Sequence, residues 1–308
     1  MSDRHPAVEL FLASSPALAE RLVGLESAAS STSPALVLGE PGTGRSTFAR
    51  LLHVGGGRAA APLVELDPAA RPATLFESEL FGYRAGAFTG AERSQPGRVA
   101  RAEGGTLILD HVEDLPLDGQ PKLLRLLAER RYSPLGGVDT EANVRFVAIG
   151  PEDLERRVER AVFRRDLYHR LEVLTFHLPP LRSRGGDFPH LVARILDDLG
   201  RRFGRPGLRL APAATEWMRS YDWPGNLRQL KNTIERQMLL SAGETLDPEP
   251  PPELARFRPT QVLSLAEAEK RAILAALQAS RGHQGEAAKL LGVSRKGLWE
   301  KRKRYGIP

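Results

Sequence analysis

The stretch GEPGTGRS, at residues 39–46, has the glycine spacing of a loop that binds phosphate groups. It follows the apolar run ALVLG and begins a segment of helical periodicity, so its backbone N–H groups and the helix dipole would face a bound anion together. We predict a nucleotide site there, although a glycine-rich turn that binds nothing has the same local pattern. The residues expected in this site are Gly39, Gly42, Gly44, Arg45, Ser46 and Thr47.

Arg45 occupies the position at which phosphate loops place a lysine. A lysine presents a compact point charge, whereas the planar guanidinium is wider and prefers bidentate contacts, so the exchange is not conservative in a tight loop. We therefore expect phosphate binding to survive and the alignment of the phosphates to suffer.

A second motif, GGTLILDH at residues 104–111, ends an apolar run on Asp110. A carboxylate at the end of a buried strand can hold Mg²⁺ through water beside a nucleotide. Many buried strands end in Asp, so the motif is weak alone, and its place after the phosphate loop strengthens it. Together the two motifs predict ATP and Mg²⁺ as cofactors.

The segment ESELFGYRAGAFTGA, at residues 77–91, lies between these two motifs. With it, the chain from about Ser15 to Gly243 closely resembles the AAA+ domains of sigma-54-dependent transcription activators (bacterial enhancer-binding proteins), for which GAFTGA is highly specific. The loop is expected to be exposed, with an apolar tip, Phe88, that solvent disfavours unless a partner covers it. A hairpin tip packed on its own domain is the alternative. The resemblance implies contact with sigma-54 by Gly86, Ala87, Phe88, Thr89, Gly90 and Ala91.

Two further segments resemble motifs of this family that carry arginines. FRRDLYHRL, at residues 163–171, is similar to the segment of the arginine fingers, which implies that Arg164 and Arg170 reach the γ-phosphate held by a neighbouring subunit. YDWPGNLRQLKN is similar to the lid motif, which implies that Arg228 senses the nucleotide of its own subunit. Fingers that act between subunits require self-association into a ring, for which a hexamer is expected, or into a dimer. Solvated helix surface is the alternative for both sets of arginines.

The chain departs from the family's pattern at the site of hydrolysis, beginning with Arg45. The family places Glu at the position of His111 to polarise the attacking water, and losing a positioned base typically costs about 10²- to 10⁴-fold in rate. The asparagine that restrains that Glu aligns with Asp67. The first sensor, normally Thr-Asn, aligns with Gly150 and Pro151, which offer no side-chain hydrogen bond.

Asp67 and His111 differ together in type, and we hypothesise that they form a hydrogen-bonded pair. Such a pair could orient His111 as a substitute base, because a neutral imidazole accepts a proton. It could equally be a structural salt link that leaves the water unactivated. Glu113 is expected on the same strand face, roughly 7 Å further on, as a poor substitute. We therefore expect nucleotide binding with slow or absent hydrolysis, and whether the chain is an enzyme stays open.

A sheet with its strand ends side by side is needed to bring these motifs together. Apolar runs alternate with helical periodicity, such as residues 119–131, which predicts a mostly parallel sheet covered by helices on both faces. After residue 187 the helical patterns 188–203, 211–221 and 226–241 take over. The predicted strands are residues 35–39, 63–66, 106–110, 144–149 and 173–178. The fold class is therefore α/β, and the resemblance implies an AAA+ P-loop domain with an all-α lid.

The last 45 residues carry ten Lys or Arg against four Glu, which equals the whole net charge of +6. Segments 264–280, 284–292 and 294–306 predict three helices, with a turn at Gly292 and an N-cap at Ser294. This helix-turn-helix strongly resembles the Fis-type domain that ends sigma-54 activators, and a basic surface helix is the alternative. We expect Ser294 at its start, Arg295, Lys296 and Trp299 in the major groove, and Lys301, Arg302, Lys303 and Arg304 at phosphates.

Five parts are expected along the 308 residues. They are an N-terminal tail (1–14), the AAA+ α/β subdomain (15–183), the helical lid subdomain (184–243), a proline-rich linker (244–262) and the Fis-type DNA-binding domain (263–308). Without cysteine, signal peptide or a run of 18 apolar residues, the chain is expected to be cytoplasmic and away from membranes. Only about 35 residues precede the first predicted strand, so we expect control by a separate protein, expression level or nucleotide state.

Together these features predict a sigma-54-dependent transcriptional regulator that binds upstream DNA, contacts sigma-54 RNA polymerase, binds ATP and hydrolyses it weakly. The alternative is a DNA-binding regulator without hydrolysis, which acts as an antagonist or as a partner of an active homologue in mixed rings.

Overall fold

The structure is a computed structural model that describes residues 15–21, 24–70, 72–250 and 283–305, together with positions 8, 269, 272–274, 276, 277, 280 and 307. The chain divides into two compact units, Met1–Glu249 and Pro250–Pro308. The predicted N-terminal tail apart from Val8, the linker beyond residue 250 and most of the predicted helix 264–280 lie outside the described residues. No helix in the described part is long and apolar enough to cross a membrane.

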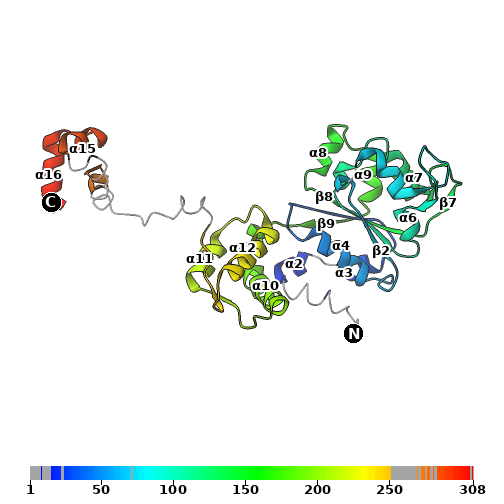
Figure 1. Cartoon of the computed structure of the whole chain (residues 1–308), viewed down its shortest axis with the longest axis horizontal. Helices are drawn as coiled ribbons and strands as arrows, with labels where there is room; N and C mark the ends of the chain where they lie inside the picture. Colours follow the sequence, from blue (N-terminus) through cyan, green and yellow to red (C-terminus); the bar gives the residue numbers. More distant parts are fainter. Residues whose placement is uncertain are drawn as a thin grey trace. The chain divides into compact units, whose positions relative to one another are not determined.

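A five-stranded parallel sheet forms the centre of the first unit (Figure 1). Its strands lie in the order β2-β5-β8-β1-β9, and every neighbouring pair is parallel. The strands are β1 (Ala35–Gly39), β2 (Leu63–Leu66), β5 (Thr106–Leu109), β8 (Arg145–Gly150) and β9 (Leu174–Leu178). All five predicted strands are confirmed within one residue of each end, because each is a short apolar run bounded by polar or turn residues.

Successive residues of the buried strands contribute to two hydrophobic layers on opposite sides of the sheet. Leu36 and Leu38 of β1 pack with one layer and Ala35 and Val37 with the other, as the alternation of side chains along a strand requires. The helices that cover these faces (Figure 1) are α2 (Pro16–Arg21), α3 (Leu25–Ser30), α4 (Arg45–Val54), α5 (Phe76–Phe81), α6 (Arg98–Arg101), α7 (Gln120–Glu129), α8 (Leu154–Glu159) and α9 (Arg165–Leu171). The predicted α/β class is therefore confirmed.

A helical subdomain with its own core follows β9. It contains α10 (Phe188–Phe203), α11 (Pro212–Ser220) and α12 (Asn226–Leu240), packed around the fully buried Trp223. Two-residue strands, β10 (Arg209–Leu210) and β11 (Thr245–Leu246), form a parallel pair there. Such short strands leave no alternation in the sequence, so they were not predicted. Because Leu246 is buried in this core, the start of the predicted linker belongs to the helical subdomain.

Two small hairpins project from the α/β part. The first joins β3 (Gly82–Tyr83) to β4 (Gln95–Pro96), and the second joins β6 (Arg131–Tyr132) to β7 (Thr140–Glu141). Five short 3-10 turns complete the described part of this unit: Pro68–Ala70, Ala73–Leu75, Val112–Asp114, Leu181–Ser183 and Gly185–Asp187.

The second unit contains α15 (Gln284–Leu290) and α16 (Arg295–Tyr305). Its small core includes Ala287, Ala288 and Leu298 together with Ile273 and Ile307. Gly292 lies between the helices with φ of 64°, and the Ser294 hydroxyl accepts a hydrogen bond from the Gly297 N–H at 3.1 Å. The predicted turn and N-cap are therefore confirmed.

Candidate functional site

A cavity of about 320 Å³ opens between the phosphate loop, the end of β5 and helix α12. It is lined by Gly42, Gly44, Arg45, Ser46, Thr47, Asp110, His111, Leu227, Arg228 and Lys231. Seven of the predicted nucleotide residues are thus brought together. The eighth, Gly39, is the last residue of β1 and does not line the cavity; an added Cβ there would lie 2.7 Å from the Leu178 carbonyl oxygen, so the packing requires glycine.

Ser46 and Asp110 bring two hard oxygen donors together. The hydroxyl of Ser46, in the first turn of α4, donates to Asp110 Oδ2 at 3.0 Å. No group of three or more His, Cys, Asp or Glu side chains among the described residues could hold a metal ion by itself. A hydroxyl and one carboxylate suit Mg²⁺, which keeps several waters and shares its remaining ligands with phosphates. The residues present therefore fit a nucleotide-bound Mg²⁺.

The hydrogen bond predicted between Asp67 and His111 is present. His111 Nδ1 lies 3.1 Å from Asp67 Oδ1, and both side chains are 40% exposed. His111 follows β5 with a positive φ of 49°, and its N–H is held by Asp110 Oδ1 at 3.0 Å. Because a carboxylate only accepts, Nδ1 carries the proton in this bond, which leaves the Nε2 lone pair free in a neutral ring.

Arg45 is turned into the protein rather than left free in the loop. Its side chain reaches the end of β8, where Nη1 donates to the backbone carbonyl of Gly150, and the residue is only 8% exposed. Burial lowers the pKa of Arg45, and the nearby charges of Glu113 and Asp110 oppose that shift. Arg45, where phosphate loops carry a lysine, thus bonds to Gly150, which aligns with the first sensor of the family.

The expectation that Glu113 shares a strand face with His111 is wrong. Strand β5 ends at Leu109, and Glu113 lies in the 3-10 turn Val112–Asp114. This turn brings the Glu113 carboxylate near Arg45, and burial raises the pKa of Glu113 while the charges of His111 and Arg45 lower it. The atom Oε2 is buried without a hydrogen-bond partner. The sequence could not show this turn, because its three residues lack a periodic pattern.

The helical subdomain is bonded directly to the phosphate loop. Asn226, the first residue of α12, donates to Glu40 Oε2 at 3.2 Å and to the Pro41 carbonyl at 3.1 Å. Arg182 holds Glu40 through two bonds of 2.9 and 2.6 Å, and these contacts lower the pKa of Glu40. A Cβ at Gly42 would lie 2.3 Å from the Gly225 carbonyl oxygen. Close backbone approach therefore places α12 at the mouth of the cavity.

The loop between β3 and β4 presents the GAFTGA residues. Gly86 and Gly90 have positive φ values of 81° and 97°, and the Gly86 N–H donates to the Ala91 carbonyl at 2.8 Å. Phe88 is 47% exposed, with one edge contact to Tyr83 at a centroid distance of 4.9 Å. The loop therefore closes on itself while its apolar tip stays half uncovered.

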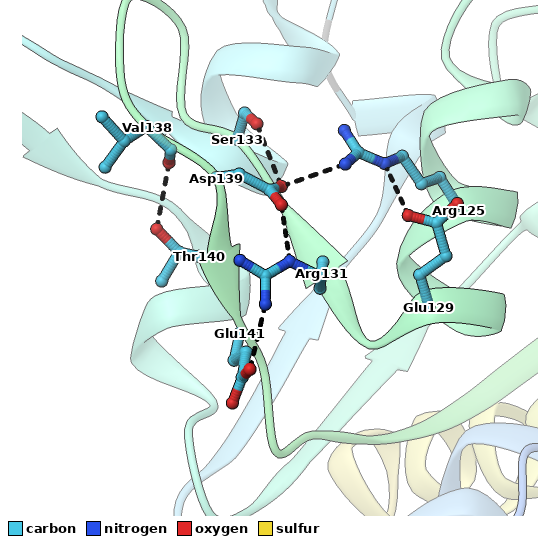
Figure 2. A network of polar contacts seen from close by, with 8 residues as sticks. All are labelled: Arg125, Glu129, Arg131, Ser133, Val138, Asp139, Thr140 and Glu141. Atoms are coloured by element: carbon cyan, nitrogen blue, oxygen red, sulfur yellow. Dashed lines mark hydrogen bonds and ion pairs between the residues drawn. The ribbon is translucent and has the colours of Figure 1, made fainter.

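The second hairpin, formed by β6 and β7, packs beside this loop. This hairpin was not predicted from the sequence. Leu135 N–H donates to the Gly82 carbonyl at 2.9 Å, and Arg84 N–H donates to the Leu135 carbonyl at 3.0 Å. Figure 2 shows the charged network that braces the hairpin, in which Arg131 binds Asp139 at 2.5 Å and Glu141 at 2.9 Å. The Gly-Gly pair at residues 136–137 was the available signal for a turn here.

Most basic side chains of α16 face solvent. Arg295, Lys296, Trp299, Lys303 and Arg304 are exposed, and the Lys303 ammonium lies 5.4 Å from the centroid of the Trp299 ring. Lys301 instead forms an ion pair with Glu269. The second unit thus presents a basic helix with one of its predicted phosphate contacts bound internally.

Three known families match consecutive parts of the chain. They are the Sigma-54 interaction domain over residues 11–177, the AAA+ ATPase lid domain over residues 182–262 and the Bacterial regulatory protein, Fis family, over residues 264–305. The first covers more than half of the 308 residues. The chain belongs to the sigma-54-dependent transcriptional regulators. The family predicted from the GAFTGA segment is confirmed.

Relatives of this sigma-54 regulator include alginate biosynthesis transcriptional regulatory protein AlgB of Pseudomonas aeruginosa, 41% identical over 300 residues that span 95% of this chain and 67% of AlgB. The Nif-specific regulatory protein of Azotobacter vinelandii is 41% identical over 273 residues, 85% of this chain and 52% of that protein. The chain thus spans between half and two thirds of these relatives. The crystal structure of NtrX from Brucella abortus in complex with ATP matches with a TM-score of 0.68 and 30% identity, covering 98% of this chain and 68% of NtrX.

The two arginines predicted to be fingers, Arg164 and Arg170, do not line the cavity of their own chain. Arg164 lies at the start of α9 and pairs with Asp166 at 2.7 Å. Arg170 donates to the Leu127 carbonyl at 3.2 Å, at the end of α7. Their separation from the cavity is compatible with action on a neighbouring subunit.

Proposed function

We propose that the chain is a transcriptional regulator that contacts sigma-54 RNA polymerase through residues 86–91 and binds upstream DNA through α16. The observation that carries the proposal is the half-uncovered Phe88 at the tip of an ordered loop. An exposed aromatic tip costs free energy unless a partner buries it. The basic, exposed face of α16 supports contact with DNA phosphates, and Trp299 lies on the part that would enter the groove.

The cavity at the phosphate loop is proposed to bind ATP with Mg²⁺. Backbone N–H groups of residues 42–47 would hold the phosphates, and Ser46 and Asp110 would hold the metal, Asp110 through water. The metal supplies positive charge that balances the phosphate oxygens. That NtrX was crystallised with ATP and with ADP supports this assignment.

Hydrolysis is proposed to be weak. His111 would act as the substitute base, and the bond from Nδ1 to Asp67 supports this role because it would leave Nε2 to accept a proton from water. Arg45 is held at Gly150 and aligns the phosphates poorly, and neither Gly150 nor Pro151 has a side chain that bonds to a phosphate. Arg164 and Arg170 would complete the site from a neighbouring subunit in a ring, taken to be a hexamer, or in a dimer.

A second function is favoured by the position of Arg45. If the bond to Gly150 persists with nucleotide bound, the chain holds ATP without useful turnover. It would then act as an antagonist, or as a partner of an active homologue in mixed rings.

Phosphate release by the purified chain is the experiment that tests hydrolysis. We expect slow release from the natural sequence and faster release from the Arg45→Lys/His111→Glu double variant, since both changes restore groups suited to hydrolysis. Asp67→Asn should slow the natural chain further. Robust turnover by the natural sequence contradicts weak hydrolysis, and unchanged turnover of the Asp67 variant contradicts the orienting role.

Transcription from a sigma-54-dependent promoter separates the two functions. If the chain is an activator, it should support open-complex formation in the presence of ATP. The Phe88→Ala variant should lose this activity, although the change does not touch the nucleotide cavity. An antagonist instead lowers the output of an active homologue mixed with it. If the chain neither binds sigma-54 nor alters transcription, the proposed function is wrong.

A further inference from the structure

The positive charge that the phosphate loop should offer is bound inside the protein. The Arg45 guanidinium donates to the Gly150 carbonyl and lies beside the carboxylates of Glu113 and Asp110. Gly150 itself is tightly packed, since an added Cβ would lie 3.1 Å from Val112 and 3.2 Å from Leu154. Releasing Arg45 would cost this buried carbonyl a hydrogen bond from a charged group, so the bond is expected to persist.

Two further cations, Arg228 and Lys231, line the same cavity from helix α12. Lys231 lies on α12, three residues after Arg228, so the two side chains share one face of the helix. Lys231 is exposed and, within the described part of the chain, makes no ion pair or hydrogen bond. Arg228 lines both this cavity and the neighbouring hollow beside Pro41 and Gly225, whereas Lys231 lines the cavity at the loop with a compact ammonium.

Helix α12 is held at a fixed place relative to the loop. Its first residue, Asn226, bonds to Glu40 and Pro41, and Gly225 touches Gly42. Lys231 is about one and a half turns further along the helix, so the contacts at the helix start set where its ammonium can reach. An ammonium on a flexible stem can adjust to phosphate oxygens, which a guanidinium fixed at a carbonyl cannot do.

We propose that Lys231 binds the terminal phosphates of the nucleotide and so replaces, from the helical subdomain, the lysine that the phosphate loop lacks. The inference rests on the proposed nucleotide binding and names the residue that supplies its charge. A contact of this kind would make the helical subdomain respond to the number of phosphates on the bound nucleotide, because ATP offers the Lys231 ammonium oxygens that AMP lacks.

Binding of fluorescently labelled ATP, ADP and AMP to the full chain tests the proposal. Lys231→Ala should weaken ATP binding about 10- to 100-fold, the range for removing a hydrogen bond to a charged group, and ADP binding less. AMP binding should not change, which also shows that the variant folds. Arg219→Ala is the matched control, because it removes an exposed cation of the same subdomain that does not line this cavity.

The Arg45→Lys background sharpens the test. A lysine in the loop can reach the phosphates itself, so Lys231→Ala should weaken ATP binding several times less there than in the natural chain. An equal weakening in both backgrounds overturns the proposed replacement.

Three other results separate the proposals. If the natural chain binds no ATP, nucleotide binding is wrong and this inference fails with it. If ATP binds and Lys231→Ala changes nothing, only the role of Lys231 is wrong. If the variant loses ATP, ADP and AMP equally, Lys231 acts on the fold or the nucleoside, and the inference is also overturned.

Discussion

The ionisable side chains behind the phosphate loop influence one another through burial and charge. Arg45 is enclosed at the end of β8, where burial lowers the pKa of its guanidinium. The negative charge of Glu113 lies close enough to oppose this shift. The charge of Arg45 stabilises the ionised form of Glu113 and lowers its pKa. Burial has the larger effect, so the pKa of Glu113 is raised. The site thus holds a buried cation beside a carboxylate that is poorly solvated when ionised.

Replacing Glu113 with Gln should therefore stabilise the first unit at neutral pH. The pKa of Glu113 is higher in the folded chain than in the unfolded chain, so the unfolded chain loses the carboxyl proton at a lower pH. Folding stability is therefore lost as pH rises from the ordinary carboxyl range through the folded-state pKa of Glu113. The glutamine does not titrate and avoids this loss. We expect a higher Tm for Glu113→Gln at pH 8 and a smaller difference at pH 5.

Thermal unfolding followed at several pH values measures this effect. Glu159→Gln is a matched control, because Glu159 is an exposed carboxylate on α8. A Tm difference for Glu113→Gln that does not change with pH, or a lower Tm at pH 8, would show that Glu113 is not destabilised by its burial.

At the scale of elements, two hairpins far apart in the sequence form one surface. The loop after β3 and the loop after β6 are joined by backbone hydrogen bonds at Leu135. The second loop is held by the charged network of Figure 2, which joins it to Arg125 on α7. Its tip residue Val138 is 75% exposed. Any partner that covers Phe88 therefore approaches a surface whose shape depends on both hairpins.

Gly136→Val should disturb this surface without affecting the nucleotide cavity. Gly136 has φ of 66°, and a Cβ there would lie 3.0 Å from the Cβ of Ala87, so a branched side chain pushes the 86–91 loop away. We expect weaker binding to purified sigma-54 and unchanged affinity for labelled ATP.

Gly207→Val serves as the control for backbone strain alone. Gly207 also has a positive φ, of 82°, but it lies in the helical subdomain and its Cβ would meet nothing closer than 3.6 Å. Equal binding of sigma-54 by the Gly136 variant and the natural chain would show that the second hairpin does not shape the contact.

At the scale of the whole molecule, charge is divided between the parts of the chain. The last 45 residues hold the entire net charge of +6, so the preceding residues are neutral overall. A neutral body with a basic end concentrates attraction for nucleic acid in one unit. Within that unit the ion pair of Lys301 with Glu269 reduces the number of free cations.

The salt dependence of DNA affinity should distinguish the exposed cations Lys303 and Arg304 from Lys301, which is paired with Glu269. Replacing Lys303 and Arg304 with Ala should lower the slope of log affinity against log salt by about 0.9 for each phosphate that is no longer neutralised. Lys301→Ala should change this slope little and lower the Tm of the second unit, because it breaks an internal pair. Fluorescence anisotropy at several salt concentrations measures the slope, and an equal change for Lys301 contradicts this assignment.

Sequence alone determined the five strands of the central sheet, the main helical segments and the chemistry expected at the strand ends. The five strands were predictable because each is a short apolar run, and α10 was predictable at residues 188–203 because its periodicity is long and regular. The pairing of Asp67 with His111 could also be inferred, since an acid and an imidazole replaced two residues that face each other in the family.

Only the tertiary structure decided where the charges of the site are directed. The bond from Arg45 to Gly150 spans 105 residues and depends on β1 lying next to β8 in the sheet. The place of Lys231 depends on how α12 meets the phosphate loop, and that of Glu113 on a turn of three residues. Local pattern is carried by neighbours along the chain, whereas these contacts depend on the order of strands and the packing of a separate subdomain.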